Sequence, residues 1–190
     1  METKNIMIVG VGGQGTLLTS RILGALTIHA GYDVKLSEVH GMAQRGGSVV
    51  TFARYGDKVY EPIVEEGQAD ILIAFERLEA LRYAHYLKKD GVIVVNDYRI
   101  DPMPVVIGAA KYPGNILEEL EKTHRVFKVD AMEEARKLGN SRIFNVIVLG
   151  IAAQHMNFSK EDWLTVIEKT VPAKTVAINQ KAFEVGYNLH

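Results

Sequence analysis

The sequence predicts one α/β domain over residues 1–190: a mostly parallel sheet with helices on both faces, an inserted β-hairpin and a helical C-terminal region. Three observations support this fold class. Short apolar runs alternate with helical patterns through the first two thirds of the chain. A β-rich stretch near residue 50 interrupts that alternation, and the last third shows helical patterns alone. A length of 190 residues also suits a single domain.

The N-terminal unit has the order strand, glycine turn, helix, strand. Residues 5–9 form an apolar run that ends in glycines. Apolar residues then recur on one helical face over residues 18–29, and Gly31 ends that helix. Residues 34–39 form the second strand. This pattern predicts a Rossmann-like start, in which the two strands pair in parallel.

A β-hairpin is predicted where an ordinary nucleotide-binding domain would place a helix. Residues 40–47 form a loop that carries three glycines. The β-rich residues 48–55 follow, and a Gly56-Asp57 turn separates them from the short run 58–60. Two runs that flank a two-residue turn of this kind are typical of a hairpin.

The alternation of strands and helices then resumes and gives way to helices. Lys88, Lys89 and Gly91 end one helix, Ser159 caps another, and Gly186 is expected to stop the last one. The predicted strands are 70–75, 92–95, 104–107 and 125–129, and the predicted helices are 76–87, 115–122, 131–138, 142–156, 160–171 and 172–185.

Composition excludes several functions. The chain has 22 Lys and Arg against 23 Asp and Glu, which argues against nucleic acid or an anionic membrane as a partner. It has no cysteine, so it cannot by itself hold a disulfide, a thiolate zinc site or a cysteine-ligated iron–sulfur cluster. We see no apolar segment of membrane-spanning length and no signal peptide, and expect a cytoplasmic protein. No metal site and no catalytic residue is predicted.

The glycine turn after the first strand is a candidate cofactor site. Gly10-Val11-Gly12-Gly13-Gln14-Gly15 matches G-x-G-x-x-G between a predicted strand and a predicted helix. Glycines let a phosphate approach the backbone, and the helix start offers free N–H groups. The alternative is a close-packed turn without a ligand. The cofactor-binding candidates are Gly10, Gly12, Gly13, Gln14, Gly15 and Thr16.

Three ligands are compared for this turn. A nucleoside triphosphate would need a lysine where Thr16 stands, which disfavours hydrolysis of such a ligand. A dinucleotide would need an acid at the end of the second strand, and Glu38 occupies that place. Coenzyme A would need only the amide groups of the turn.

A second unusual segment is the loop over residues 40–47. Arg45 stands between Gln44 and two glycines and is free to reach a carboxylate or phosphate, unless it is simply solvated. Asn145 lies in an otherwise apolar helix, where it either bonds internally or faces a ligand or partner. The candidates for contact with substrate or partner are His40, Gln44, Arg45, Gly46, Gly47 and Asn145.

These segments carry a resemblance to a known family. The motif Gly10–Gly15, followed by Gln44-Arg45-Gly46-Gly47 and a hairpin, resembles the gamma family of 2-oxoacid:ferredoxin oxidoreductases. The longer stretch from Glu38 to Gly47 is similar to the indolepyruvate branch of that family in particular. The similarity spans essentially the whole chain, including Arg142-x-x-Asn145.

The resemblance implies a subunit of a complex. Such complexes decarboxylate a 2-oxoacid on thiamine diphosphate, pass electrons through [4Fe–4S] clusters to ferredoxin, and transfer the acyl group to coenzyme A. A large Cys-rich alpha subunit is expected to hold the thiamine diphosphate and the clusters, since this chain lacks both cysteine and a Gly-Asp-Gly motif. This chain would help to position coenzyme A or substrate and would be inactive alone.

Two other functions stay open at this point. One is the gamma subunit of a pyruvate or ketoisovalerate enzyme of the same family. The other is a stand-alone dinucleotide-binding sensor or reductase, for which Glu38 would bind the ribose.

Overall fold

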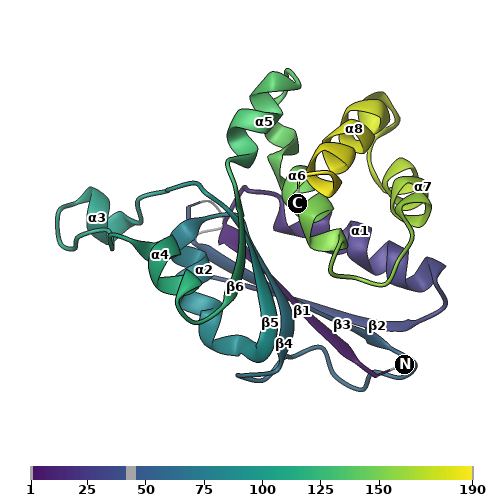
Figure 1. Cartoon of the computed structure of the whole chain (residues 1–190), viewed down its shortest axis with the longest axis horizontal. Helices are drawn as coiled ribbons and strands as arrows, with labels where there is room; N and C mark the ends of the chain where they lie inside the picture. Colours follow the sequence, from purple (N-terminus) through teal and green to yellow (C-terminus); the bar gives the residue numbers. More distant parts are fainter. Residues whose placement is uncertain (1, 42–45, 190) are drawn as a thin grey trace.

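The computed structural model describes residues 2–41 and 46–189, and this part of the chain forms a sheet with helices on both faces (Figure 1). The strand order is β2-β3-β1-β4-β5-β6. The strands are β1 (Lys4–Val11), β2 (Asp33–His40), β3 (Ser48–Gly56), β4 (Ala69–Ala74), β5 (Leu87–Asn96) and β6 (Arg125–Val129).

The sheet is mostly parallel, as predicted. β1 pairs in parallel with β4, β4 with β5, and β5 with β6, whereas β3 runs antiparallel to both β2 and β1. The expected parallel pairing of the first two strands is wrong, because β3 lies between them. Burial explains this order: Val49 to Ala53 of β3 are all buried, whereas β2 is largely exposed and polar, as suits an edge strand.

The inserted hairpin is present, but its strands are not those predicted. β2 and β3 form it, joined by residues 41–47, with His40 opposite Val49. The predicted return strand 58–60 is wrong, since these residues are not in a strand. Instead the backbone N–H of Val59 donates to Asp33 Oδ2 at 2.9 Å, which turns the chain back towards the start of β2.

Helices cover both faces of the sheet (Figure 1). One face carries the long helices and a core in which Ile8, Ile73 and Val94 of the sheet contact Ile147. None of the described helices is long and apolar enough to cross a membrane. The first face carries α1 (Thr16–His29), α5 (Ala131–Lys137), α6 (Phe144–Ala153), α7 (Lys160–Thr170) and α8 (Val176–Tyr187), and the other carries α2 (Arg77–Tyr83) and α4 (Ile116–Glu121).

Other elements differ from the prediction. The helix end expected at Lys88, Lys89 and Gly91 is wrong, because these residues lie in β5, which begins at Leu87. Residues 104–107 are not a strand: the chain there forms the short helix α3 (Met103–Val106), whose start follows Pro102 and contains Pro104, which suits a first helical turn. Short 3₁₀ turns lie at η1 (Ala84–Tyr86), η2 (Ser141–Ile143) and η3 (Ala173–Thr175), so the last helix begins at Val176 rather than at residue 172.

Gly186 does not stop the last helix but lies inside it, at a close crossing of α6 and α8. A Cβ built on Gly186 would overlap the carbonyl oxygen of Ile147, and one on Gly150 would overlap that of Phe183. The two helix backbones therefore come into direct contact, because each helix has a glycine where it meets the backbone of the other.

We expect Gly186→Ala to lower the free energy of unfolding by about 3 kcal/mol, because the added methyl forces the two helices apart in a fully packed core. Urea denaturation of the purified chain measures this loss. Gly114→Ala is the control, since a Cβ there meets nothing within 4 Å. Equal stability of the two variants would contradict the close crossing.

A buried carboxylate on α2 holds the start of β3. Glu79 is 4% exposed, and the hydroxyl of Ser48 donates to its Oε2 at 2.5 Å. Burial raises the pKa of Glu79, and this effect exceeds the lowering by the Ser48 hydrogen bond and by Arg82. The native state therefore binds this proton more tightly than the unfolded chain does. Stability contributed by the neutral form is therefore complete below the ordinary carboxyl pKa and falls as pH rises towards the raised value.

Glu79→Gln should remove this dependence. Relative to the parent chain, we expect the variant to gain stability as pH rises from about 4 to about 7, because glutamine cannot ionise. Denaturation curves at both pH values give the comparison. Glu65→Gln, at an exposed position, should leave the pH dependence unchanged. A parent chain whose stability rises with pH as steeply as that of Glu79→Gln would refute this role.

Candidate functional site

The glycine turn lies at the carboxyl edge of the sheet, between β1 and α1. Gly13 and Gly15 have φ angles of 102° and 92°, which L side chains rarely adopt. A Cβ at Gly15 would overlap the amide of Asn145, whereas a Cβ at Gly13 would meet open space. Glycine is thus needed at Gly15 for packing and at Gly13 for backbone conformation, and the turn leaves room for a ligand beside Gly13.

Gln14 braces this turn from inside. Its Oε1 accepts the Val11 N–H at 2.7 Å, and its Nε2 donates to the Phe75 carbonyl at 3.0 Å. The residue is buried. Both polar groups of the side chain are therefore used within the chain, and a ligand at this point would meet the backbone of the turn.

The two glycine segments identified in the sequence are joined in space. The Gly12 N–H donates to the Gly47 carbonyl at 2.8 Å, and the Gly46 N–H donates back to the Gly12 carbonyl at 3.3 Å. This pair of hydrogen bonds holds the two segments side by side. Gln44 and Arg45, two of the predicted contact residues, lie outside the described residues.

A cavity of about 440 Å³ opens between the turn and the end of β2. Glu38 is its acidic side: Oε2 accepts from the hydroxyls of Thr16 at 3.4 Å and Thr51 at 3.2 Å. His40 also lines the cavity, and its Nδ1 lies 2.9 Å from the Gly41 carbonyl. The remaining lining comes from Gly12, Gly13, Gly15, Thr16, Leu17 and Val49.

The cavity has two chemically different sides. The N-terminus of α1 offers backbone N–H groups and a partial positive charge, which favour an anion near Gly13. The carboxylate of Glu38 disfavours an anion on the opposite side and suits hydroxyl donors instead. A molecule with both a phosphate and a ribose would match the two sides.

Asn145, at the start of α6, contacts the glycine turn on its buried side. The side chain is 3% exposed, its Nδ2 donates to the Gly15 carbonyl at 3.4 Å, and its Oδ1 accepts the Val146 N–H at 3.0 Å. Of the two expectations for this residue, the structure thus gives an internal partner, and that partner belongs to the candidate site.

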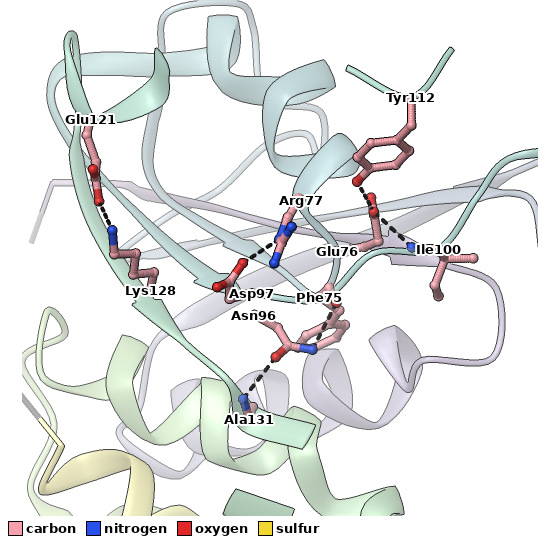
Figure 2. Close-up of polar contacts among 10 residues, drawn as sticks. All are labelled: Phe75, Glu76, Arg77, Asn96, Asp97, Ile100, Tyr112, Glu121, Lys128 and Ala131. Carbon is pink, nitrogen blue, oxygen red and sulfur yellow. Dashed lines mark hydrogen bonds and ion pairs between the residues drawn. The ribbon is translucent and has the colours of Figure 1, made fainter. Parts of the chain in front are cut away.

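Asn96 is a structural partner of the site that the sequence analysis missed. Figure 2 shows its Nδ2 donating to the Phe75 carbonyl at 3.2 Å and its Oδ1 accepting the Ala131 N–H at 3.0 Å. Because Gln14 donates to the same Phe75 carbonyl, the glycine turn is linked through β4 and β5 to the start of α5. In the sequence, the position of Asn96 at the end of an apolar strand could have indicated that its side chain has a structural role.

Glu76 was missed as well, and it fixes a projecting segment, residues 99–114, which we call the arm. The carboxylate is 1% exposed, and its Oε1 accepts from the Ile100 N–H at 3.2 Å and the Tyr112 hydroxyl at 2.5 Å (Figure 2). The guanidinium of Arg99 lies 4.3 Å from the Tyr112 ring centre. Both ends of the arm are therefore held at one carboxylate, while α3 projects from the body (Figure 1).

The arm borders the candidate site. A cavity of about 270 Å³ is lined by Gly46 and Gly47 on the loop side and by Ile100 and Pro102 of the arm, and Glu79 also lines it. Within the described residues, no group of three His, Cys, Asp or Glu side chains is placed to hold a metal ion.

Comparison with known proteins identifies the same family that the two glycine segments resemble. The model of the pyruvate ferredoxin/flavodoxin oxidoreductase family matches residues 5–189. The chain is 46% identical over 189 residues to the indolepyruvate oxidoreductase subunit IorB of Archaeoglobus fulgidus, covering 97% of this chain and 94% of the relative. Identity to IorB of Thermococcus kodakarensis is 42% over 194 residues, covering 98% and 95%.

A solved structure gives the same result. The keto/oxoacid ferredoxin oxidoreductase gamma subunit from Geobacter sulfurreducens superposes with a TM-score of 0.72 at 25% identity, covering 97% of this chain and 96% of that one. The resemblance carried by residues 10–15 and by the loop that ends at Gly47 is thereby confirmed: this chain belongs to the pyruvate ferredoxin/flavodoxin oxidoreductase family.

Proposed function

We propose that this chain is the non-redox subunit of a cytoplasmic indolepyruvate ferredoxin oxidoreductase. In this complex, a partner subunit carries out the oxidative decarboxylation that depends on coenzyme A. The observation that carries the proposal is identity of 42–46% over nearly the full length to relatives named for indolepyruvate.

The redox chemistry belongs to a partner. Iron–sulfur clusters are held by cysteine thiolates, and this chain has no cysteine. A large Cys-rich alpha subunit supplies thiamine diphosphate for decarboxylation and [4Fe–4S] clusters for electron transfer, and ferredoxin docks through the complex. No nucleic acid and no membrane takes part.

This chain contributes a binding surface for coenzyme A. The N–H groups at the start of α1 bind a phosphate beside Gly13, and Glu38 accepts a hydrogen bond from a hydroxyl group of the coenzyme. The cavity of about 440 Å³ at this place supports the assignment. Binding there orients the coenzyme towards the partner and excludes water from the reacting carbon, which is catalysis by proximity.

The loop beside the cavity supplies further contacts. We assign His40, Gln44, Arg45, Gly46 and Gly47 to substrate or partner, and the Arg45 guanidinium pairs with a carboxylate or phosphate. Asn145 acts indirectly, because its amide holds the Gly15 carbonyl.

A gamma subunit of a pyruvate enzyme is the alternative, since the family is named for pyruvate. Sequence identity to the IorB relatives is higher than identity to a pyruvate synthase subunit, which favours an aryl-pyruvate as the substrate instead. The substrate assay below separates the two.

Co-expression with the Cys-rich subunit from the same genome tests the proposal. We expect the purified complex to reduce ferredoxin with indolepyruvate, only when coenzyme A and thiamine diphosphate are present, and to prefer indolepyruvate over pyruvate. Each subunit alone should be inactive. Preference for pyruvate would favour the alternative, and turnover by this chain alone would refute the proposal.

Gly13→Ala tests the coenzyme site in that complex. A methyl group there would project into open space beside the turn, and we expect KM for coenzyme A to rise about tenfold with KM for indolepyruvate unchanged. The matched control is Gly31→Ala, because Gly31 also has a positive φ, 83°, with nothing within 4 Å of an added Cβ. If both variants change KM equally, backbone strain and not the cavity is responsible.

A further inference from the structure

A second cavity lies at the opposite, amino edge of the sheet. Its volume is about 280 Å³, and we call it the amino-edge cavity. Strand register builds its floor: Tyr55 lies opposite Lys4, and Ile71, Val92 and Arg125 follow in one row across β4, β5 and β6. Residues 155–158, between α6 and α7, form the other side.

One wall of this cavity is aromatic. Tyr32, Tyr55 and Phe158 line it, with ring centres 6.0 Å apart for Tyr32 and Tyr55 and 5.5 Å apart for Tyr55 and Phe158. Aromatic side chains pack well against another ring in an edge or offset arrangement. The wall therefore suits a planar ring more than a flexible aliphatic chain.

Some charged side chains at the cavity are paired within the described part of the chain, and others are not. Asp70 is satisfied within the chain, because it accepts the Asn5 N–H at 2.8 Å and pairs with Lys88 at 2.9 Å and Lys4 at 3.7 Å. Asp90 and Arg125 line the same cavity, and neither has an ion pair with any described residue. The cavity thus offers one anion and one cation to a ligand.

Tyr55 adds a neutral donor. It is 3% exposed, and its hydroxyl has no hydrogen-bond partner within residues 2–41 and 46–189. Burial, with a smaller effect of the Asp70 charge, raises the pKa of Tyr55, so the hydroxyl stays protonated. The hydroxyl oxygen is itself accessible at this cavity, so it can donate to a ligand oxygen there.

We propose that the amino-edge cavity binds a free aromatic α-amino acid. The carboxylate of the ligand pairs with Arg125 and accepts from the Tyr55 hydroxyl, its ammonium group pairs with Asp90, and its ring lies against Tyr32 and Phe158. The volume lies just below the usual range of ligand pockets, which suits a small molecule of this size better than a nucleotide. An aryl-pyruvate lacks the ammonium group and would leave Asp90 unpaired.

Titration calorimetry on the full chain tests each recognised group. We expect saturable binding of L-phenylalanine or L-tryptophan. Binding should be at least about tenfold weaker for phenylpyruvate, which lacks the ammonium group, for phenethylamine, which lacks the carboxylate, and for L-alanine, which lacks the ring. Failure of both aromatic amino acids to bind would overturn the proposal. So would equal binding of phenylpyruvate, which would leave no role for Asp90, or of L-alanine, which would leave none for the aromatic wall.

Variants locate the binding. Asp90→Asn and Tyr55→Phe should each weaken L-phenylalanine binding several-fold without unfolding the chain, because each keeps the size of its side chain. Asp101→Asn and Tyr86→Phe make the same chemical changes away from the cavity and should have no effect. Unchanged affinity in both cavity variants would place the ligand elsewhere and refute the site. The assay needs no turnover, so its result is independent of the proposed function.

Discussion

Buried side-chain amides hold the carboxyl edge of the sheet, and the geometry of the candidate site depends on them. Gln14 and Asn96 donate to one carbonyl, that of Phe75, while Asn145 donates to the carbonyl of Gly15. A buried amide is stable only when its polar groups are paired, and leaving one unpaired costs about 1–3 kcal/mol. These residues therefore fix the positions of three strand ends and two helices relative to the glycine turn, whether or not a ligand is bound.

Within the glycine motif, the side chain and the backbone have different roles. Gln14 is the most polar residue of the glycine turn, yet its amide points inward and leaves the outer surface to backbone N–H groups. Glycines at the outer positions keep that surface open, and the return loop at Gly46 and Gly47 closes one side of it through hydrogen bonds to Gly12. The pairing of the two segments therefore holds the loop next to the cavity, whose own lining comes from the glycine turn, the start of α1, β2 and β3.

The sequence predicted what depends on local pattern. β6 over residues 125–129 and the cap of α7 at Ser159, which accepts the Asp162 N–H at 3.1 Å, follow from apolar runs and capping residues. The insertion of β3 between β2 and β1 depends on long-range burial, which a strand's own residues do not specify. Glu76 has ordinary neighbours in the sequence, and its role arises from Ile100 and Tyr112, 24 and 36 residues away. Gln14 was recognised through its motif, but the direction of its amide required the position of Phe75.

The arm shows what a shared anchor does for a surface segment. Because Ile100 and Tyr112 both bond to one oxygen of Glu76, the segment between them is closed into a loop without a covalent cross-link. Cleavage of the chain near α3, where Met103 and Val106 are exposed, would leave two stubs still tethered to the same carboxylate. The nicked molecule would keep its body and its glycine cavity, and would lose order only at the tip.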